Sequence, residues 1–206
     1  TTFSYIQVFI GLSGDISHFD IKNTNYRIFS DNPYNFSHDP TEKNWSPPNM
    51  IITFPSLRDS AHKDPLNNTV EILVPVRYSH FTQWENSTLG NRPGEYKRIK
   101  KEIEEKLLEI FKNQFPGIDK HIKYVETGTP LTYKHYFSHK DGEAYGIAST
   151  PERVNSPHLQ ARSKIKNLYF SGTDTCIHGI LGTFATGLIT ASAIIGKNLF
   201  KRKNLD

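Results

Sequence analysis

The residues best suited to chemistry lie near the C-terminus, in the segment NLYFSGTDTCIHGILGTFATGLITASAIIG, residues 167–196. A short apolar strand at 168–170 ends beside Gly172, and a polar turn with a single acid, Asp174, follows it. The next stretch has the pattern of a helix whose first turns hold small residues such as Gly182. Because small side chains leave the amide groups of a helix N-terminus accessible, this segment is suited to a large, electron-rich ligand.

A flavin dinucleotide matches this combination of groups. Its ring has an N1–C2=O edge that becomes anionic on reduction, and free amides at residues 181–183 would stabilise that charge and raise the reduction potential. Asp174 would accept a hydrogen bond from a ribityl hydroxyl, and Gly172 would let the main chain approach the phosphates. Tyr145 would stack beside the ring or shape the cavity, and the alternative is an ordinary core tyrosine. The predicted cofactor-binding residues are Tyr145, Gly172, Thr173, Asp174, Gly179, Ile180, Leu181, Gly182 and Thr183.

Other interpretations of this segment stay open. Residues 177–196 contain no Asp, Glu, Lys or Arg and precede Lys197, so by length they could span a bilayer. His178 and several Gly, Ser and Thr residues argue against a span. A buried helix, packed closely against a sheet through its small residues, is the other alternative. His178 is either a hydrogen-bonding or proton-handling group or a helix-entry residue that satisfies a backbone carbonyl. We expect Cys176 to be a small buried residue.

Two motifs carry a family resemblance. The run NLYFSGTDT-CIHGILGTFATGLITA resembles the closing flavin-contact motif of the phytoene-desaturase-related flavoproteins, which include carotenoid desaturases, carotenoid isomerases and retinol saturases. The upstream stretch ETGTPLTYKHYFSHKDGEAYGI, residues 126–147, resembles the family's Thr-Pro-Leu-Thr segment with its following Gly-x-x-Tyr-Gly. The order of ITFPSLRDSAHKDP and VEILVPV resembles the family's strands around its substrate cavity. The resemblance covers essentially the whole chain.

The chain departs from the family in one respect. Such enzymes begin with a βαβ unit that carries GxGxxG and binds the pyrophosphate and adenosine. No such motif occurs here, because Gly11-x-x-Gly14 and Gly142-x-x-x-Gly146 have the wrong spacing. The resemblance therefore implies the C-terminal half of such a flavoprotein, with the missing N-terminal half of the same protein as its partner. We expect that the chain alone does not retain FAD firmly.

The predicted fold class is α+β, with a mixed or antiparallel sheet. Residues 1–150 would form a substrate-binding region, and residues 151–206 the C-terminal part of a Rossmann-like FAD-binding domain. The patterns predict helices at 96–115 and 182–199, the first ended by Pro116-Gly117. Strands enriched in β-branched and aromatic residues are predicted at 3–12, 50–54, 70–76, 122–126 and 168–170.

Composition narrows the possible functions. The 206 residues carry a formal charge of +4 that is spread evenly, which argues against a nucleic-acid partner. A single cysteine excludes an internal disulfide and a multi-cysteine metal site. His135 and His139 are four residues apart on a segment that we expect to be loop or strand, so no metal site is predicted. The chain opens without a basic leader, and we expect a cytoplasmic or peripheral-membrane location.

By resemblance, the predicted function is FAD-dependent oxidation, reduction or isomerisation of a hydrophobic polyene such as a carotenoid or retinoid. The flavin would carry the chemistry by hydride transfer at its N5, so no side chain is assigned a catalytic role. Peripheral contact with a membrane is compatible with such lipid-soluble substrates. The alternative is a non-catalytic interaction domain that has lost the cofactor-binding half.

Overall fold

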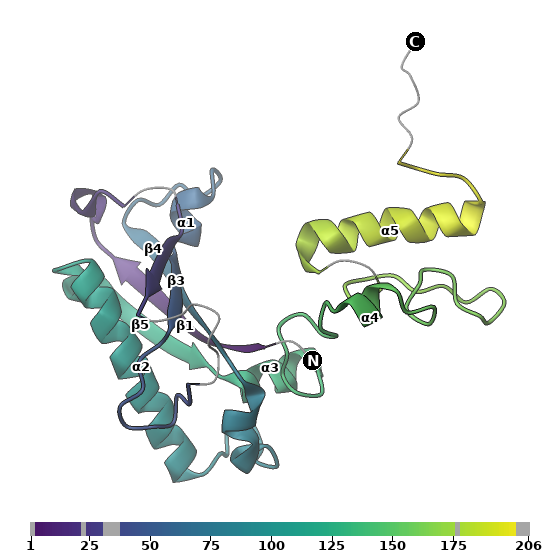
Figure 1. The fold of residues 1–206 in the computed structure, drawn as a ribbon. Coiled ribbons are helices and arrows are strands. Elements are labelled where there is room, and N and C mark those ends of the chain that lie inside the picture. The colour runs from purple at the N-terminus through teal and green to yellow at the C-terminus, as the bar shows by residue number, and fades with distance from the viewer. Residues whose placement is uncertain (1–2, 22–23, 31–37, 176–177, 201–206) are drawn as a thin grey trace. The chain divides into compact units, whose positions relative to one another are not determined.

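The structure is a computed structural model that describes residues 3–21, 24–30, 38–175 and 178–200 (Figure 1). It contains two compact units, one of residues 3–143 and one that begins at Ala144. The first unit combines a sheet with helices, which confirms the predicted α+β class for this part of the chain.

The sheet of the first unit is antiparallel throughout, with strand order β2-β3-β4-β1-β5. Its strands are β1 (Ser4–Ser13), β2 (Tyr26–Phe29), β3 (Asn49–Thr53), β4 (Asn67–Val76) and β5 (Ile122–Gly128). Four of them confirm predicted strands, whereas β2 was not predicted. The side chains of β1 alternate between buried and partly exposed positions, so one face of the sheet is core and the other stays partly open.

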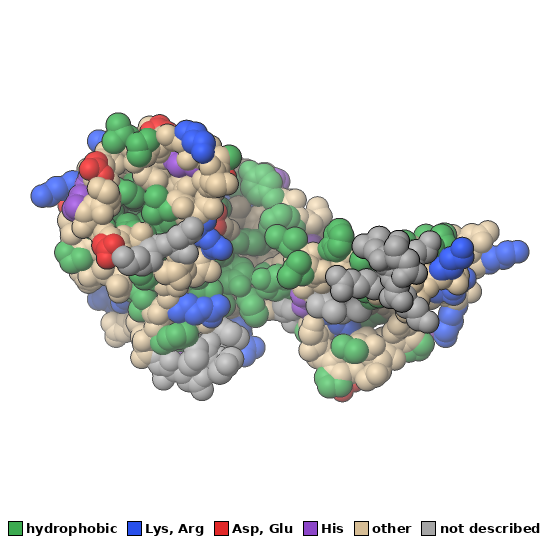
Figure 2. Space-filling view, turned by 90° about the horizontal axis from the view of Figure 1, so that it is seen from above, with side chains coloured by type: hydrophobic (Ala, Val, Ile, Leu, Met, Phe, Trp, Pro, Cys, Tyr) green, Lys and Arg blue, Asp and Glu red, His purple; other side chains and the backbone are tan. Residues whose placement is uncertain are grey.

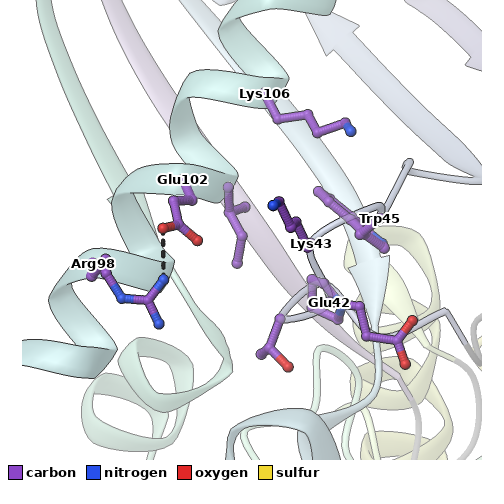
Figure 3. A pocket seen from close by; sticks show the side chains of 9 residues that line it. Glu42, Lys43, Trp45, Arg98, Glu102 and Lys106 are labelled. Atoms are coloured by element: carbon purple, nitrogen blue, oxygen red, sulfur yellow. Dashed lines mark hydrogen bonds and ion pairs between the residues drawn. The ribbon is translucent and has the colours of Figure 1, made fainter.

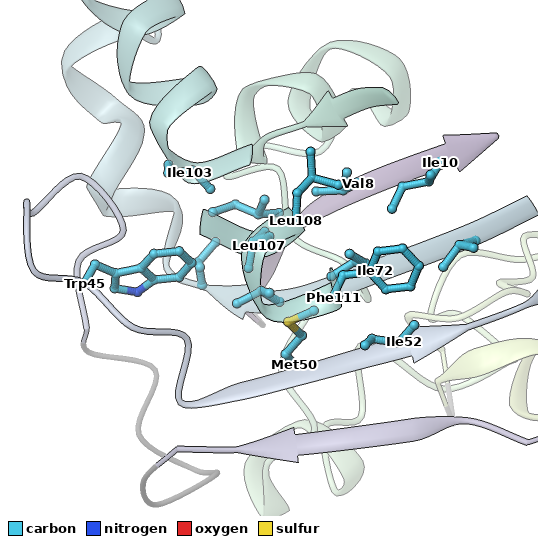
Figure 4. Close-up of a cluster of buried hydrophobic side chains, with 14 of the residues drawn as sticks. Val8, Ile10, Trp45, Met50, Ile52, Ile72, Ile103, Leu107, Leu108 and Phe111 are labelled. Carbon is cyan, nitrogen blue, oxygen red and sulfur yellow. The ribbon is translucent and has the colours of Figure 1, made fainter. Parts of the chain in front are cut away.

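Helix α2 (Gly94–Gln114) covers the core face, as the helical periodicity predicted. It places Ile103, Leu107 and Phe111 among buried side chains that come from the strands, including Ile72 (Figure 4). The helix ends at Phe115, which is followed by Gly117 in a left-handed conformation with φ of 93°. This termination agrees with the predicted Pro-Gly stop.

Helix α3 (Pro130–Phe137) corrects the expectation that the segment around His135 is loop or strand. Thr129 and Thr132 form a reciprocal capping box, and Pro130 occupies the first turn. These local signals outweigh the aromatic, strand-like composition of the segment. The other short helices of this unit are α1 (Pro55–Arg58) and the 3-10 helices η1 (Ser17–Phe19), η2 (Tyr78–Trp84) and η3 (Ile118–His121).

The second unit contains helices α4 (Pro151–Val154) and α5 (Gly179–Ile195). The predicted strand at 168–170 is wrong as a sheet strand. Within the described residues, only Tyr169 forms a β-bridge there, with Arg162, and the amide of Phe170 donates to the carbonyl of Ala161 at 2.8 Å. The segment pairs briefly with its own upstream chain, because no longer strand of this unit lies beside it in the described part.

Helix α5 begins three residues earlier than predicted and ends in Gly196, a left-handed C-cap with φ of 69°. Its early turns expose apolar side chains to a high degree, since Ile180 is 90% and Leu181 is 85% exposed. Among the described residues, no helix has the length and apolar character needed to cross a membrane.

His80, on η2, gives the sheet unit a testable pH dependence. Burial lowers the pKa of His80 below its ordinary value, against an opposing attraction from Asp39. As the pH falls below about 6.5, the unfolded chain therefore binds a proton that the folded chain resists. This stability is present above that pH and is lost below it. We expect His80→Gln to flatten the fall in the free energy of unfolding between about pH 7 and pH 5, measured by urea unfolding; parallel curves would contradict this.

Candidate functional site

The N-terminus of α5 leaves backbone amides open. The helix begins at Gly179, and its N-cap, His178, makes no side-chain capping bond. The amides of residues 178–181 therefore have no acceptor within the helix. This moves the predicted open amides from 181–183 to 178–181, because the helix starts earlier than its small residues indicated.

The glycines around this helix start permit close backbone approach. Gly172 has φ of +108° and Gly179 has φ of +80°, and a Cβ built at either position would meet no atom within 4 Å. Both residues thus combine a conformation that favours glycine with open space beside the backbone. Gly182 differs, because it is buried and its carbonyl accepts a bond from the Thr186 hydroxyl at 2.9 Å. The side chain of Thr183 is exposed.

The last residues of the upstream family motif, 145–147, lie against the C-terminal motif. The Asp174 carboxylate accepts a hydrogen bond from the amide of Ile147 at 2.8 Å. A Cβ at Gly146, whose φ is +70°, would come within 2.4 Å of an Asp174 oxygen. Asp174 therefore holds the main chain at residues 146–147, in addition to its predicted role toward a ligand. Tyr145 stacks on the imidazole of His178, with ring centroids 5.7 Å apart and an interplanar angle of 15°.

Arg153 is the residue of this site that sequence reasoning missed. Its side chain is only 6% exposed, and its guanidinium donates to Thr173 O at 2.6 Å and to Ser149 Oγ at 3.0 Å. It also contacts His178 Nε2 at 2.6 Å. The cap residue Thr150 and the following Pro151 mark a helix start in the sequence, but a lone arginine in a polar segment carries no signal of burial.

The junction has the electrostatics of a site for an anionic or electron-rich group. Arg153 Nε is buried without a hydrogen-bond partner, and within the described residues no carboxylate contacts the guanidinium. The open amides of α5 add partial positive charge. The donor set, the orphaned Nε and the open glycine backbone thus fit a dinucleotide cofactor whose phosphates or ring edge are negative. Cys176 and Ile177, between Asp174 and His178, lie outside the described residues.

A second candidate surface is the open face of the sheet. Phe9 of β1 is 40% exposed there, and Tyr133 of α3 donates to Gln7 Oε1 at 2.6 Å. Apolar side chains reach the surface of this unit (Figure 2). A hollow of about 380 Å³ opens beside Phe9 and is lined in part by Tyr96 and Tyr136. This face offers aromatic surface to an apolar ligand.

The sheet unit has another hollow, of about 620 Å³, between α2 and residues 40–45 (Figure 3). Its lining mixes acidic and basic side chains, and Arg98 and Glu102 form an ion pair across 2.6 Å. None of the predicted site residues lines it.

The structure groups no metal ligands in the part of the chain it describes: no three or more His, Cys, Asp or Glu side chains lie close enough to hold an ion. His135 lies on α3, whereas His139 follows the helix and its Nδ1 contacts the carbonyl of Glu143 at 2.7 Å.

No profile of a known protein family matches the chain. Over 95% of its length, however, it is 30% identical to the all-trans-retinol 13,14-reductase of Danio rerio. It is a homologue of these reductases. The corresponding proteins of Rattus norvegicus and Homo sapiens are each 29% identical, over 96% and 97% of the chain. The predicted resemblance to the retinol-saturase-like proteins is thereby confirmed.

The chain spans about a third of the length of these reductases, 34% of the Danio rerio and Rattus norvegicus proteins. A Danio rerio protein named an inactive all-trans-retinol 13,14-reductase is also similar, with 25% identity over 95% of the chain. Similarity to the reductases is therefore compatible with both a catalytic and a non-catalytic protein.

Proposed function

We propose that the chain supplies the polyene-binding sheet and the flavin-facing helix end of a FAD-dependent oxidoreductase that acts on a retinoid or a related apolar polyene. The observation that carries this proposal is the junction of Gly172, Asp174 and the α5 N-terminus, where open amides and a buried Arg153 lie together. The similarity to proteins named retinol reductases supports the substrate class.

On the cofactor side, the chain's residues would bind and orient. The amides of 178–181 would meet the electron-rich ring edge, and Gly172 would let the backbone approach the phosphates. Asp174 would accept from a ribityl hydroxyl while it keeps the amide of Ile147. When bound, FAD supplies hydride transfer at its N5.

On the substrate side, the open sheet face would bind the polyene and exclude water from it. Phe9, Tyr133 and Tyr136 present aromatic surface there, and burial of apolar area contributes about 25 cal/mol per Å². Peripheral contact with a membrane remains part of the proposal, because such substrates partition into lipid.

The proposal requires a dinucleotide-binding βαβ unit with GxGxxG in addition to these 206 residues. The greater length of the homologous reductases leaves room for one in those proteins. We propose that the N-terminal half of the same protein supplies it, and that this chain alone does not retain FAD. A non-catalytic interaction domain is the second candidate, favoured by the similar protein that is named inactive.

Asp174→Asn in the intact protein tests the cofactor side. The asparagine keeps an oxygen for the Ile147 amide but removes the charge offered to a ribityl hydroxyl, so we expect about tenfold weaker FAD affinity. The measurement is flavin absorbance per protein after gel filtration, followed by FAD titration. Asp119→Asn, an exposed acid on η3, is the matched control and should retain flavin normally.

Unchanged FAD affinity in Asp174→Asn would contradict the assigned role of Asp174. An intact wild-type protein that binds no FAD would refute the flavoprotein proposal. Retention of FAD without turnover of retinol or other polyenes would favour the non-catalytic candidate.

A further inference from the structure

We propose that Arg153 is the positioning residue of the α5 junction: it clamps the Gly172–Thr175 turn to the helix start and fixes His178 in the tautomer protonated on Nδ1. This inference rests on the function proposed above, because the clamped groups are those that would face the cofactor. It assigns a role to a residue that the sequence patterns did not single out.

The contacts of Arg153 join separate segments of the second unit. One terminal nitrogen donates to the carbonyl of Thr173, in the turn, and the other lies 2.6 Å from His178 Nε2 at the helix start. The latter nitrogen also donates to Ser149 Oγ, at the entry to α4. A guanidinium has donors in a rigid plane, so these contacts fix the angle between the turn and α5. Lysine, with one compact ammonium group, cannot reproduce them all.

The chemistry of these contacts determines the tautomer of His178. A guanidinium only donates, so Nε2 must accept and cannot carry a proton while the contact is kept. The ring proton then belongs to Nδ1, which lies 3.2 Å from Ser149 Oγ and can donate to it. Tyr145 stacks on the ring and restrains its plane. The imidazole is therefore held in one orientation beside the helix start, with Nε2 as an acceptor and Nδ1 as a donor.

Among the described residues, no carboxylate forms an ion pair with Arg153. A cation that is only 6% exposed is normally paired with a carboxylate, but the acceptors here are a carbonyl, a hydroxyl and an imidazole, all neutral. The nearby Asp174 accepts from the Ile147 amide instead. The guanidinium of Arg153 and the open amides of α5 thus both place positive charge or partial positive charge at this junction. They favour a ligand that brings, or acquires on reduction, negative charge at this junction.

The alternative is that Arg153 contributes only to the stability of the fold and has no effect on ligand binding. In that case its contribution to stability would be the same whichever nitrogen of His178 carries the proton. The tautomer and the cofactor affinity are therefore the readouts that separate the two roles.

The first measurement is long-range ¹H–¹⁵N correlation NMR of histidine in the wild-type chain, with His178→Gln used to assign the signal. We expect an unprotonated Nε2 and a protonated Nδ1 at neutral pH. In Arg153→Met, which has no donor to Nε2, we expect the tautomer protonated on Nε2 to become populated. In Ser149→Ala we expect Nε2 to stay unprotonated, because Arg153 still donates to it. Lys164→Gln, which removes an exposed cation of the same unit, is the charge-matched control and should change nothing. A wild-type His178 protonated on Nε2 would overturn the proposal, even if Arg153→Met did not fold.

The second measurement is FAD titration of the intact protein and of its folded Arg153→Lys variant. We expect the lysine variant to bind FAD about tenfold more weakly, since it keeps the charge but loses the fork geometry. Equal affinities would overturn the positioning role. If the tautomer is as expected but the wild-type protein binds no FAD, the contact between Arg153 and His178 is supported and the proposed flavoprotein function is refuted.

Discussion

Gly142→Ala is expected to lower the free energy of unfolding of the sheet unit by about 3 kcal/mol. Gly142 has φ of +54°, and a Cβ there would lie 2.2 Å from the carbonyl oxygen of Pro130. That oxygen belongs to the backbone of the first turn of α3, which cannot rotate away as a side chain can. The carbonyl of Gly142 also accepts a bond from the buried Ser4 hydroxyl, so a shift of the loop would strain β1 as well.

Gly90→Ala is the control that separates the cost of the contact with Pro130 from the cost of the left-handed backbone conformation. Gly90 has a comparable φ of +82°, but a Cβ there would meet nothing within 4 Å. It should therefore cost only the left-handed strain of about 1 kcal/mol. Urea unfolding followed by tryptophan fluorescence measures both variants. Equal decreases in the free energy of unfolding of the two variants would show that the contact with Pro130 does not contribute.

Phe111→Ala is expected to cost about 3–5 kcal/mol, because it removes a large side chain from the centre of the core. Phe111 is fully buried on α2, and its ring centroid lies 6.4 Å from that of Phe54 and 5.5 Å from that of Phe115. The cavity would lie between α2 and the sheet, where the close-packed strands relax little.

Lys112→Ala is the control for the Phe111 substitution, one residue further along the same helix. Lys112 is exposed, so its removal should change the stability by no more than about 0.5 kcal/mol. Thermal and urea unfolding of both variants give the comparison. A loss below about 1 kcal/mol for Phe111→Ala would mean that the core closes around the missing ring.

Arg153 gives the proposed site a physical basis that the motifs alone lacked. The sequence suggested a ligand through small residues and one acid, which also suit a tightly packed helix. The buried guanidinium at the same junction, which contacts no carboxylate within the described residues, supports our proposal of a negatively charged ligand. It also explains how His178 can lie at the helix start without capping it through its side chain.

Long elements with strong periodicity could be predicted from the sequence. The apolar spacing of α2 and the β-branched alternation of β1 and β4 depend on side chains near each other in the chain, so their patterns are local. Strand β2 was missed because it has only four residues and gains its stability from pairing with β3. The predicted strand at 168–170 is wrong for the opposite reason: it has strand composition, but within the described residues its only β-bridge is to Arg162.

The sequence by itself determined the family resemblance, the α+β class and the motif that holds Asp174 and Gly179. It could not show that Asp174 binds the amide of Ile147, or that Arg153 is buried against His178, 25 residues away. Those contacts join residues far apart in the chain, and no local propensity encodes them. Only the folded chain decides which polar groups lose water and which of them are left without a partner.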